Sequence, residues 1–475
     1  MKNIFEILSV VTCCTLMAGA AVPEGIPPLA SNDLSCDPLR PQLRYTQKRG
    51  WANDPNGLGF WKGEWHFFHQ YNPFGVKWGN MHWNHAVSKD LVHWTELGLA
   101  LKPDDLGTMF SGSAVTDVDN TAGFGAGAQV LIYTAAGKPF TQCLAYSQDG
   151  RTYTKYAGNP VLKNLSDGNR DPRVFWHAPT KAWVMALYGT ENGHHVMWIF
   201  NSPNLKDWTK VSTYVGGDLK VKDRWLYECP GLEEIRIEGE EKTAWDVWGA
   251  DDVYGVGDFN GKVFTPRAER LPGIARGKGP MSYYAAQTYA DAPDGRTLWV
   301  AWYRLPYLDG SSYQHSFSLP QELTLRRMAD GLRLVRRPAR ELKALRTGSA
   351  LSCADYAASK VELAEVDVSA TCGDGARLAF NLAGVPFVYE AASQSLTVAG
   401  TTVPWKLVSG KLAFKIYLDR IGLEIFSDDG LQMAPIAAAR SKLDAPRFES
   451  VEQKNVANFS LSAFPLKSIW ANRAP

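Results

Sequence analysis

The chain of 475 residues is predicted to be all-β, with a five-bladed β-propeller followed by a C-terminal β-sandwich. Three observations favour this fold class. Apolar and polar residues alternate over short runs bounded by turn residues, which is typical of strands. Aromatic-rich runs recur at nearly regular intervals. Helical periodicity is almost absent, apart from a short helix expected around residues 340–346.

The aromatic runs form a repeat whose starting positions are 64, 53, 61 and 54 residues apart. They are EWHFFHQY at 64–71, AQVLIYTA at 128–135, KAWVMALY at 181–188, KTAWDVWG at 242–249 and RTLWVAWY at 296–303. A Ser-x-Asp/Asn turn followed by an aromatic residue runs out of phase with them at Ser88, Ser147 and Ser202, with a degenerate copy in 256–264. Such a repeat favours radial repetition of four-stranded sheets, and a chance succession of hairpins is the alternative.

The repeat divides the chain into domains. It weakens after Leu325, and a basic segment at 336–347 is the expected junction, so the propeller is placed at 40–335 and the sandwich at 348–475. Residues 1–21 have the charge, the apolar run and the small-x-small pattern of a secretory signal peptide. We therefore expect a secreted protein, extracellular or periplasmic. No other segment resembles a membrane-spanning helix.

The charge and the aromatic content of the chain indicate which kinds of molecule it can bind. The formal net charge is +1 and no long run of Lys and Arg occurs, which removes the electrostatic case for a nucleic-acid partner. The aromatic fraction of 12% suits a neutral ligand such as a sugar. No cysteine or histidine spacing indicates a metal site. Of the five cysteines after the signal peptide, Cys353 and Cys372 are the pair best placed for a disulfide, and the odd count leaves at least one free thiol.

Three acidic motifs occupy similar positions in the repeat. Asp54, in WANDPNG, lies ten residues before the first aromatic run. Asp171, in GNRDPR, lies ten before the third, and Glu228, in YECPGL, lies fourteen before the fourth. Taken singly, each motif has a structural interpretation. WANDPNG is typical of a tight turn, Asp171 can pair with a neighbouring arginine, and Glu228 can be an ordinary surface glutamate. Taken together, they predict three carboxylates that meet at the propeller axis.

Such a cluster has a chemical use. Carboxylates in one pocket repel each other, so at least one should have a raised pKa and hold its proton near neutrality. A carboxylate beside a protonated acid is the arrangement that cleaves glycosides. The neighbouring motifs supply groups for binding a sugar. Hydrogen bonds are expected from Asn53, Gln70, Ser111 and Arg170, and stacking faces from Trp51, Trp78 and Trp83.

These motifs resemble those of the glycoside hydrolase family 32 enzymes, the β-fructofuranosidases that include invertases, exo-inulinases and levanases. WANDPNG, GNRDPRVFW and YECPGL are similar to the family's three acidic boxes. FHQYNP at 68–73, WGNMHW at 78–83, FSGS at 110–113, YYAAQ at 283–287 and SLP at 318–320 agree as well. The resemblance extends over about residues 43–470.

The resemblance implies a reaction and a role for each acid. Asp54 would be the nucleophile, Glu228 the general acid/base and Asp171 the transition-state stabiliser. Terminal β-D-fructofuranosyl units of sucrose, inulin or levan would be released as fructose with retained configuration, without metal or organic cofactor. Two carboxyl groups acting in this way lie about 5–5.5 Å apart.

Some positions depart from the family pattern, namely Ala52, His69, Asn84 and Gln321. None is a catalytic carboxylate, and Ala52 and Asn84 are expected to reshape the rim of the site. Two alternatives stay open: a fructosyltransferase on the same scaffold, in which a sugar hydroxyl replaces water, and a sugar-binding propeller without activity. The sequence predicts no oligomeric state.

Overall fold

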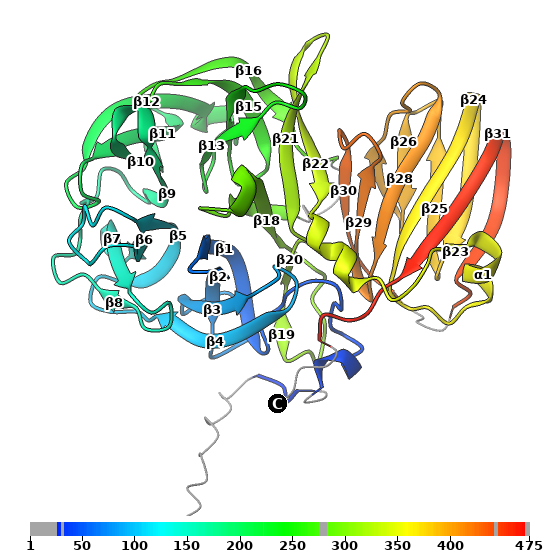
Figure 1. The fold of residues 1–475 in the computed structure, drawn as a ribbon, viewed down its shortest axis with the longest axis horizontal. Coiled ribbons are helices and arrows are strands. Elements are labelled where there is room, and N and C mark those ends of the chain that lie inside the picture. The colour runs from blue at the N-terminus through cyan, green and yellow to red at the C-terminus, as the bar shows by residue number, and fades with distance from the viewer. Residues whose placement is uncertain (1–25, 30–32, 222, 276–282, 441–444, 471–475) are drawn as a thin grey trace, which may run out of the picture.

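The computed structural model describes residues 26–29, 33–221, 223–275, 283–440 and 445–470. Figure 1 shows five small sheets around a common axis, with a larger sheet beside the fifth. The predicted all-β architecture of propeller and sandwich is therefore confirmed. The predicted signal peptide at 1–21 lies outside the described residues. Within the described ranges, no helix is long and apolar enough to cross a membrane.

Each blade is an antiparallel sheet with its first strand nearest the axis. The first blade comprises β1 (Gly50–Trp61), β2 (Glu64–Asn72), β3 (His82–Ser88) and β4 (Trp94–Leu101). The second comprises β5 (Thr108–Asp117), β6 (Ala128–Ala136), β7 (Phe140–Ser147) and β8 (Thr154–Lys155). The third comprises β9 (Arg170–His177), β10 (Ala182–Glu191), β11 (His194–Ser202) and β12 (Thr209–Asp218).

The last two blades follow the same plan. The fourth comprises β13 (Gly231–Arg236), β14 (Thr243–Trp248), β15 (Val253–Phe259) and β16 (Phe264–Pro272). The fifth comprises β17 (Tyr283–Thr288), β18 (Thr297–Tyr303), β21 (Gln321–Met328) and β22 (Gly331–Pro338), with β20 (Ser316–Phe317) paired to β18. Between them, β19 (Tyr313–Gln314) leaves the fifth blade and pairs in parallel with β1, which joins the last blade to the first.

The repeat in the sequence has a direct structural meaning. The five aromatic runs are the second strands of the five blades, β2, β6, β10, β14 and β18. The Ser-x-Asp/Asn signature is the turn between the third and fourth strands. Oδ1 of Asp90 accepts hydrogen bonds from the backbone amides two and three residues later, at 3.1 and 2.8 Å. Asp149, Asn204 and Asn260 accept the same pair of bonds in the next three blades.

The C-terminal domain consists of one nine-stranded sheet and one short helix. They are β23 (Leu351–Ser352), α1 (Cys353–Ala358), β24 (Ala364–Leu382), β25 (Val385–Glu390), β26 (Ser395–Val398), β27 (Thr401–Pro404), β28 (Lys411–Leu418), β29 (Ile421–Ser427), β30 (Met433–Ala439) and β31 (Phe448–Pro465). The two long strands β24 and β31 pair along their length, while β24 pairs with β28 in its first half and with β25 in its second. The sheet thereby folds over a single apolar core.

Five short 3-10 helices complete the described elements. They are η1 (Leu34–Cys36), η2 (Ala178–Thr180), η3 (Leu219–Val221), η4 (Pro293–Gly295) and η5 (Arg340–Leu345). The last of these is the short helix expected around 340–346, and it lies between β22 and β23. The described chain therefore passes from the propeller to the sandwich through one short helix.

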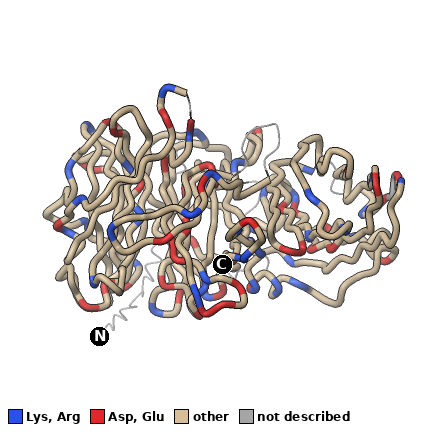
Figure 2. Tube along the Cα trace, turned by 90° about the horizontal axis from the view of Figure 1, so that it is seen from above, with Lys and Arg blue, Asp and Glu red and all other residues tan. Residues whose placement is uncertain are grey.

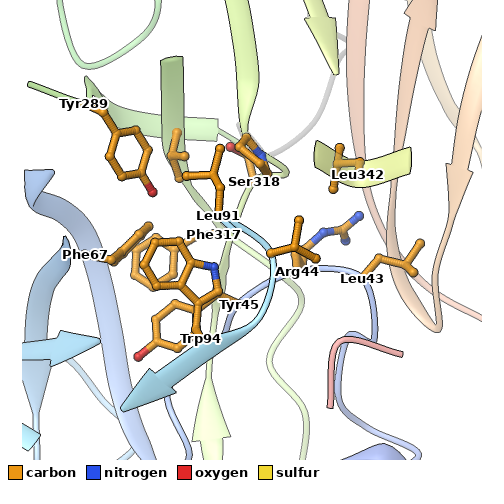
Figure 3. A pocket seen from close by; sticks show the side chains of 13 residues that line it. Leu43, Arg44, Tyr45, Phe67, Leu91, Trp94, Tyr289, Phe317, Ser318 and Leu342 are labelled. Atoms are coloured by element: carbon orange, nitrogen blue, oxygen red, sulfur yellow. The ribbon is translucent and has the colours of Figure 1, made fainter. Parts of the chain in front are cut away.

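A buried ionic cluster joins the N-terminal segment, the fifth blade and the sandwich. Nε of Arg44 lies 3.3 Å from Oε1 of Glu424, and its Nη1 lies 3.9 Å from Oδ2 of Asp419. The guanidinium also lies over the ring of Tyr303, 5.0 Å from its centroid. Figure 3 shows Arg44 beside a water-sized cavity of about 20 Å³, whose other lining residues include Phe67 and further aromatic rings. The two domains thus share a core at this point.

Charges of both signs are spread over the two domains. Figure 2 shows Lys and Arg interspersed with Asp and Glu along the described trace of the propeller and of the sandwich. Many of them pair locally, as Lys155 does with Asp104 at 2.6 Å. The arrangement agrees with the small formal net charge of +1.

The predicted disulfide between Cys353 and Cys372 is wrong, because both cysteines are free. Cys372 pairs with Val456 on β31, whereas Ser352, which precedes Cys353, pairs with Ser462 on the same strand. These partners are separated by six positions along a strand, or roughly 20 Å. That separation exceeds the span that a disulfide can bridge.

Candidate active site

The three predicted acids lie at the same end of three inner strands. Asp54 lies on β1, Asp171 is the second residue of β9, and Glu228 precedes β13 by three positions. The backbone is left-handed at Asp171 (φ 65°), Glu228 (φ 57°) and Cys229 (φ 44°), a region that non-glycine residues rarely adopt. Strain of this kind is concentrated at functional sites, where the surrounding structure maintains it.

The thiol of Cys229 joins two of the acids. Its Sγ lies 3.4 Å from Oδ2 of Asp171 and 3.7 Å from Oδ2 of Asp54, and its backbone N–H donates to the same oxygen of Asp171 at 3.0 Å. The third acid is joined through Arg170. Nη2 of Arg170 donates to Oε1 of Glu228 at 2.5 Å, while its Nε lies 3.7 Å from Oδ2 of Asp171. The structure therefore brings together three carboxyl groups that are distant in sequence.

Asp54 is buried, and hydrogen-bond donors surround one of its oxygens. Oδ2 accepts from Ser111 Oγ at 2.6 Å and from Gln70 Nε2 at 3.2 Å, whereas Oδ1 accepts from Asn53 Nδ2 at 3.1 Å. Burial raises the pKa of Asp54, and the bonds from Ser111 and Asn53 oppose that rise by stabilising the ionised form. The charge of Glu228 raises the pKa of Asp54 further.

Asp171 has the clearest shift among the three acids. Burial raises its pKa to about 7, and the charges of Asp54 and Glu228 act in the same direction, while Arg170 acts in the opposite direction. Its backbone N–H donates to Oγ1 of Thr134 at 3.0 Å, which fixes the start of β9 against the second blade. Asp171 is therefore the acid of the cluster whose pKa is raised to near neutrality.

Glu228 is the most accessible of the charged groups in the cluster. Its side chain is 21% exposed, against 4% for Asp171. Besides Arg170, it accepts a hydrogen bond from the hydroxyl of Tyr284, and that hydroxyl accepts from Nη2 of Arg224 at 3.0 Å. Glu228 is thus held from both sides while one edge faces solvent, which suits a group that exchanges protons with substrate and water.

The residues predicted to bind sugar fall into two groups. The first group contacts the acids directly: Asn53, Gln70 and Ser111 contact Asp54, and Arg170 contacts Glu228 and Asp171. Trp78 lies outside these contacts. It is 58% exposed, and its ring lies 6.1 Å from the ring of Phe110, the residue before Ser111. Trp78 therefore offers an accessible face beside the acids rather than among them.

Two expectations about neighbouring residues are wrong. Trp83 is fully buried and donates its indole N–H to the carbonyl of Phe110 at 2.9 Å, so it offers no face to a sugar. Ala52 and Asn84 are also buried, and neither lies on the rim. Nδ2 of Asn84 lies 3.4 Å from Nε2 of His69, so two of the departures from the family pattern contact each other inside the first blade.

The structure brings two further side chains into contact with the acids, and the sequence alone assigned neither of them a role. The Cys229 thiol lies between two acids, and Tyr284 contacts the third. Both are inside motifs that the sequence had marked, YECPGL and YYAAQ. Their positions inside these motifs were therefore the only sign in the sequence that Cys229 and Tyr284 belong to the site. Their contacts with the acids become visible only in the folded structure.

Comparison with known proteins agrees with this geometry. The model of the glycosyl hydrolases family 32 N-terminal domain matches residues 45–338. A levanase of Bacillus subtilis is 33% identical, over 99% of this chain and 76% of its own length. An extracellular exo-inulinase of Aspergillus niger is 34% identical, over 63% of this chain and 65% of its own length. The crystal structure of an exo-inulinase from Aspergillus awamori superposes with a TM-score of 0.78 at 25% identity, covering 91% of this chain and 99% of that one.

The family model spans more than half of the chain, and the levanase aligns with almost all of it. Both matches include the segments that supply the three clustered carboxyl groups. The chain belongs to glycoside hydrolase family 32.

Proposed function

We propose that the protein is a retaining β-fructosidase that hydrolyses terminal β-D-fructofuranosyl units of sucrose, inulin or levan and releases fructose. The observation that supports this most strongly is the convergence of Asp54, Asp171 and Glu228 through Cys229 and Arg170. Relatives named levanase, exo-inulinase and invertase agree in the sugar on which they act. The relatives named extracellular and the N-terminal sequence favour export of the protein.

The first chemical step forms a fructosyl-enzyme ester. Oδ1 of Asp54 is the oxygen proposed to attack the anomeric carbon, because it accepts one side-chain hydrogen bond, from Asn53, whereas Oδ2 accepts from both Ser111 and Gln70. As that bond forms, the bond to the leaving sugar breaks, and Glu228 gives its proton to the leaving oxygen. Asp171 and Arg170 bind the hydroxyls of the fructosyl unit and stabilise the oxocarbenium-like transition state.

The second step reverses the roles. Glu228, now ionised, takes a proton from a water molecule, and the resulting hydroxide attacks the anomeric carbon and displaces Asp54. Two displacements on opposite faces give retained configuration. The separation of about 5–5.5 Å between the carboxyl groups of Asp54 and Glu228 stays a prediction of this mechanism.

Chromatography of products from sucrose, inulin and levan, incubated side by side, tests the proposal. Fructose is the expected product from at least one of them. Trisaccharides that accumulate from concentrated sucrose in place of free fructose would instead indicate a fructosyltransferase. The absence of any product from all three sugars would contradict the proposed function and favour a sugar-binding propeller without activity.

A further inference from the structure

A second pocket lies at the end of the propeller opposite the acids. The inner strands run from the acids toward this end, where residues from β5, β9, β13 and the segment after β17 surround a pocket of about 420 Å³. We call this the far pocket; the residues of it used here are Thr116, Arg173, Trp176, Glu233, Glu234 and Asp291. Its volume lies within the range of about 300–1,000 Å³ that is usual for sites of small ligands.

A polar layer separates the far pocket from the acids. Arg173 donates to Glu233 Oε2 at 2.5 Å and to Thr288 Oγ1 at 2.7 Å, and Thr288 also donates to Glu233 at 2.5 Å. On the other side of this layer, Arg173, Asp171 and Cys229 line a small cavity of about 10 Å³. Arg173 therefore lines both the far pocket and the small cavity. Because it separates them, a ligand in the far pocket cannot reach the carboxyl groups that perform the reaction.

An aromatic platform stands at the far pocket. Trp176 is 39% exposed, although it is a large apolar residue at the end of an inner strand. Its ring packs against the buried Trp183, with centroids 5.1 Å apart at an angle of 65°. Contact with a buried ring limits the movement of the exposed one. An indole that is partly exposed and packed against a second ring is a suitable surface for the apolar face of a sugar ring.

The charged groups of the far pocket favour a neutral ligand that donates hydrogen bonds. Both lining arginines are already paired, Arg173 with Glu233 and Arg296 with Glu322 and Glu341. The exposed carboxylates of Glu234 and Asp291 remain accessible as acceptors, and each accepts from only one described side chain, that of a threonine. An anion would be repelled by them. Within the described ranges, no cluster of His, Cys, Asp and Glu is placed to hold a metal ion.

We propose that the far pocket is a second, non-catalytic site that binds one sugar unit of a neutral oligosaccharide, with Trp176 as the stacking platform and Glu234 and Asp291 as acceptors for hydroxyl groups. The site would hold a saccharide on the opposite side of the propeller from the reaction. It extends the proposed function, because a chain bound there raises the concentration of substrate near the enzyme without being cleaved at that point.

Calorimetric titration of the Asp54→Asn variant tests the proposal without consuming the ligand. The probes are short inulin-type and levan-type oligosaccharides, with maltotetraose as an unrelated neutral sugar. Two binding sites per chain are expected for at least one probe. Adding Trp176→Ala should weaken one of them about tenfold and leave the other unchanged. Adding Trp78→Ala should affect only the site beside the acids.

Matched variants exclude a general effect on folding. Val118→Ala removes an exposed apolar side chain just beyond β5 that does not line the far pocket, so both sites should bind as before. Glu234→Gln keeps the shape of an exposed side chain and should weaken the same site as Trp176→Ala. One site per chain for every probe, unaffected by Trp176→Ala and Glu234→Gln, would overturn the proposal. Fructose release by the unmodified enzyme is measured separately, so failure of the proposed function is distinguishable.

Discussion

Nη2 of Arg170 lies 2.5 Å from Oε1 of Glu228 and thereby connects the third blade to the fourth at the centre of the site. The same guanidinium is close to Asp171. Burial lowers the pKa of Arg170, but the charges of Asp171 and Glu228 outweigh burial and raise that pKa above its usual value. Arg170 is therefore a permanent positive charge that holds two of the three acids in place. Its contacts explain why the motifs around Asp171 and Glu228 act together.

Replacing this arginine tests the connection. Arg170→Ala should lower kcat/KM for fructose release about 100-fold or more, because Glu228 loses a donor and the fructosyl unit loses a binding group. Since Arg170 lowers the pKa of Asp171, its removal should also shift the acidic limb of the pH–rate profile to higher pH. Arg151→Ala, which removes an exposed arginine paired with Glu64, is the control. An unchanged acidic limb would argue against the role assigned to Arg170.

The raised pKa of Asp171 predicts that replacing this residue by asparagine increases the stability of the protein at high pH while abolishing its activity. Its ordinary value is 3.8, and burial raises it to about 7, so the folded state holds this proton more tightly than the unfolded state. The wild-type protein therefore loses stability as the pH rises from about 4 to about 7. Asp171→Asn removes that loss and should be more stable than wild type at pH 8, by about 2–4 kcal/mol, but inactive.

Thermal unfolding of both proteins at pH 4 and pH 8 measures this difference. The two free energies of unfolding should approach each other at pH 4, where the carboxyl group is protonated in the folded protein. A variant that is less stable than wild type at pH 8 would show that Asp171 is ionised in the folded state without cost, contrary to the effect of its burial.

The buried cluster at Arg44 should couple the stability of the two domains. Arg44→Met leaves Asp419 and Glu424 buried without their cation, which typically costs about 3–5 kcal/mol. The whole chain should then unfold at a lower temperature in a single transition. Arg340→Ala breaks an exposed pair with Asp294 and should cost less than about 1 kcal/mol. Unfolding of the sandwich alone, with an unchanged propeller transition, would contradict the coupling.

Thiol titration checks the cysteines. Protein lacking residues 1–25 contains five cysteines, all of them free, so five thiols should react in denaturant. In the native protein, Cys36 is exposed and should react first, whereas burial raises the pKa of the Cys229 thiol well above its ordinary value and suppresses its reaction. Rapid labelling of Cys36 should leave activity intact. If only three thiols react in denaturant, two cysteines form a disulfide, and the pair Cys353 and Cys372 would have to be reconsidered.

The sequence was informative where a short-range pattern determines the structure. The second strand of every blade and the turn at Asp90 and its equivalents follow from alternation and from Asx chemistry, which act over a few residues. The convergence of the acids followed from their similar positions in the repeat. Contacts between distant segments could not be predicted from the sequence, because they depend on how side chains pack in the folded protein. The burial of Trp83 and the separation of Cys353 from Cys372 are examples.

In the proposed mechanism, Asp54 attacks the sugar while the other two acids assist. Fructose release from sucrose, inulin and levan by Asp54→Asn, compared with wild type, tests it most directly. Asparagine retains the shape and can keep the hydrogen bond with Ser111, so the melting temperature should change little. A loss of kcat of at least about 10³-fold is expected on the sugar that wild type hydrolyses. Turnover by a folded Asp54→Asn variant at the wild-type rate would contradict it.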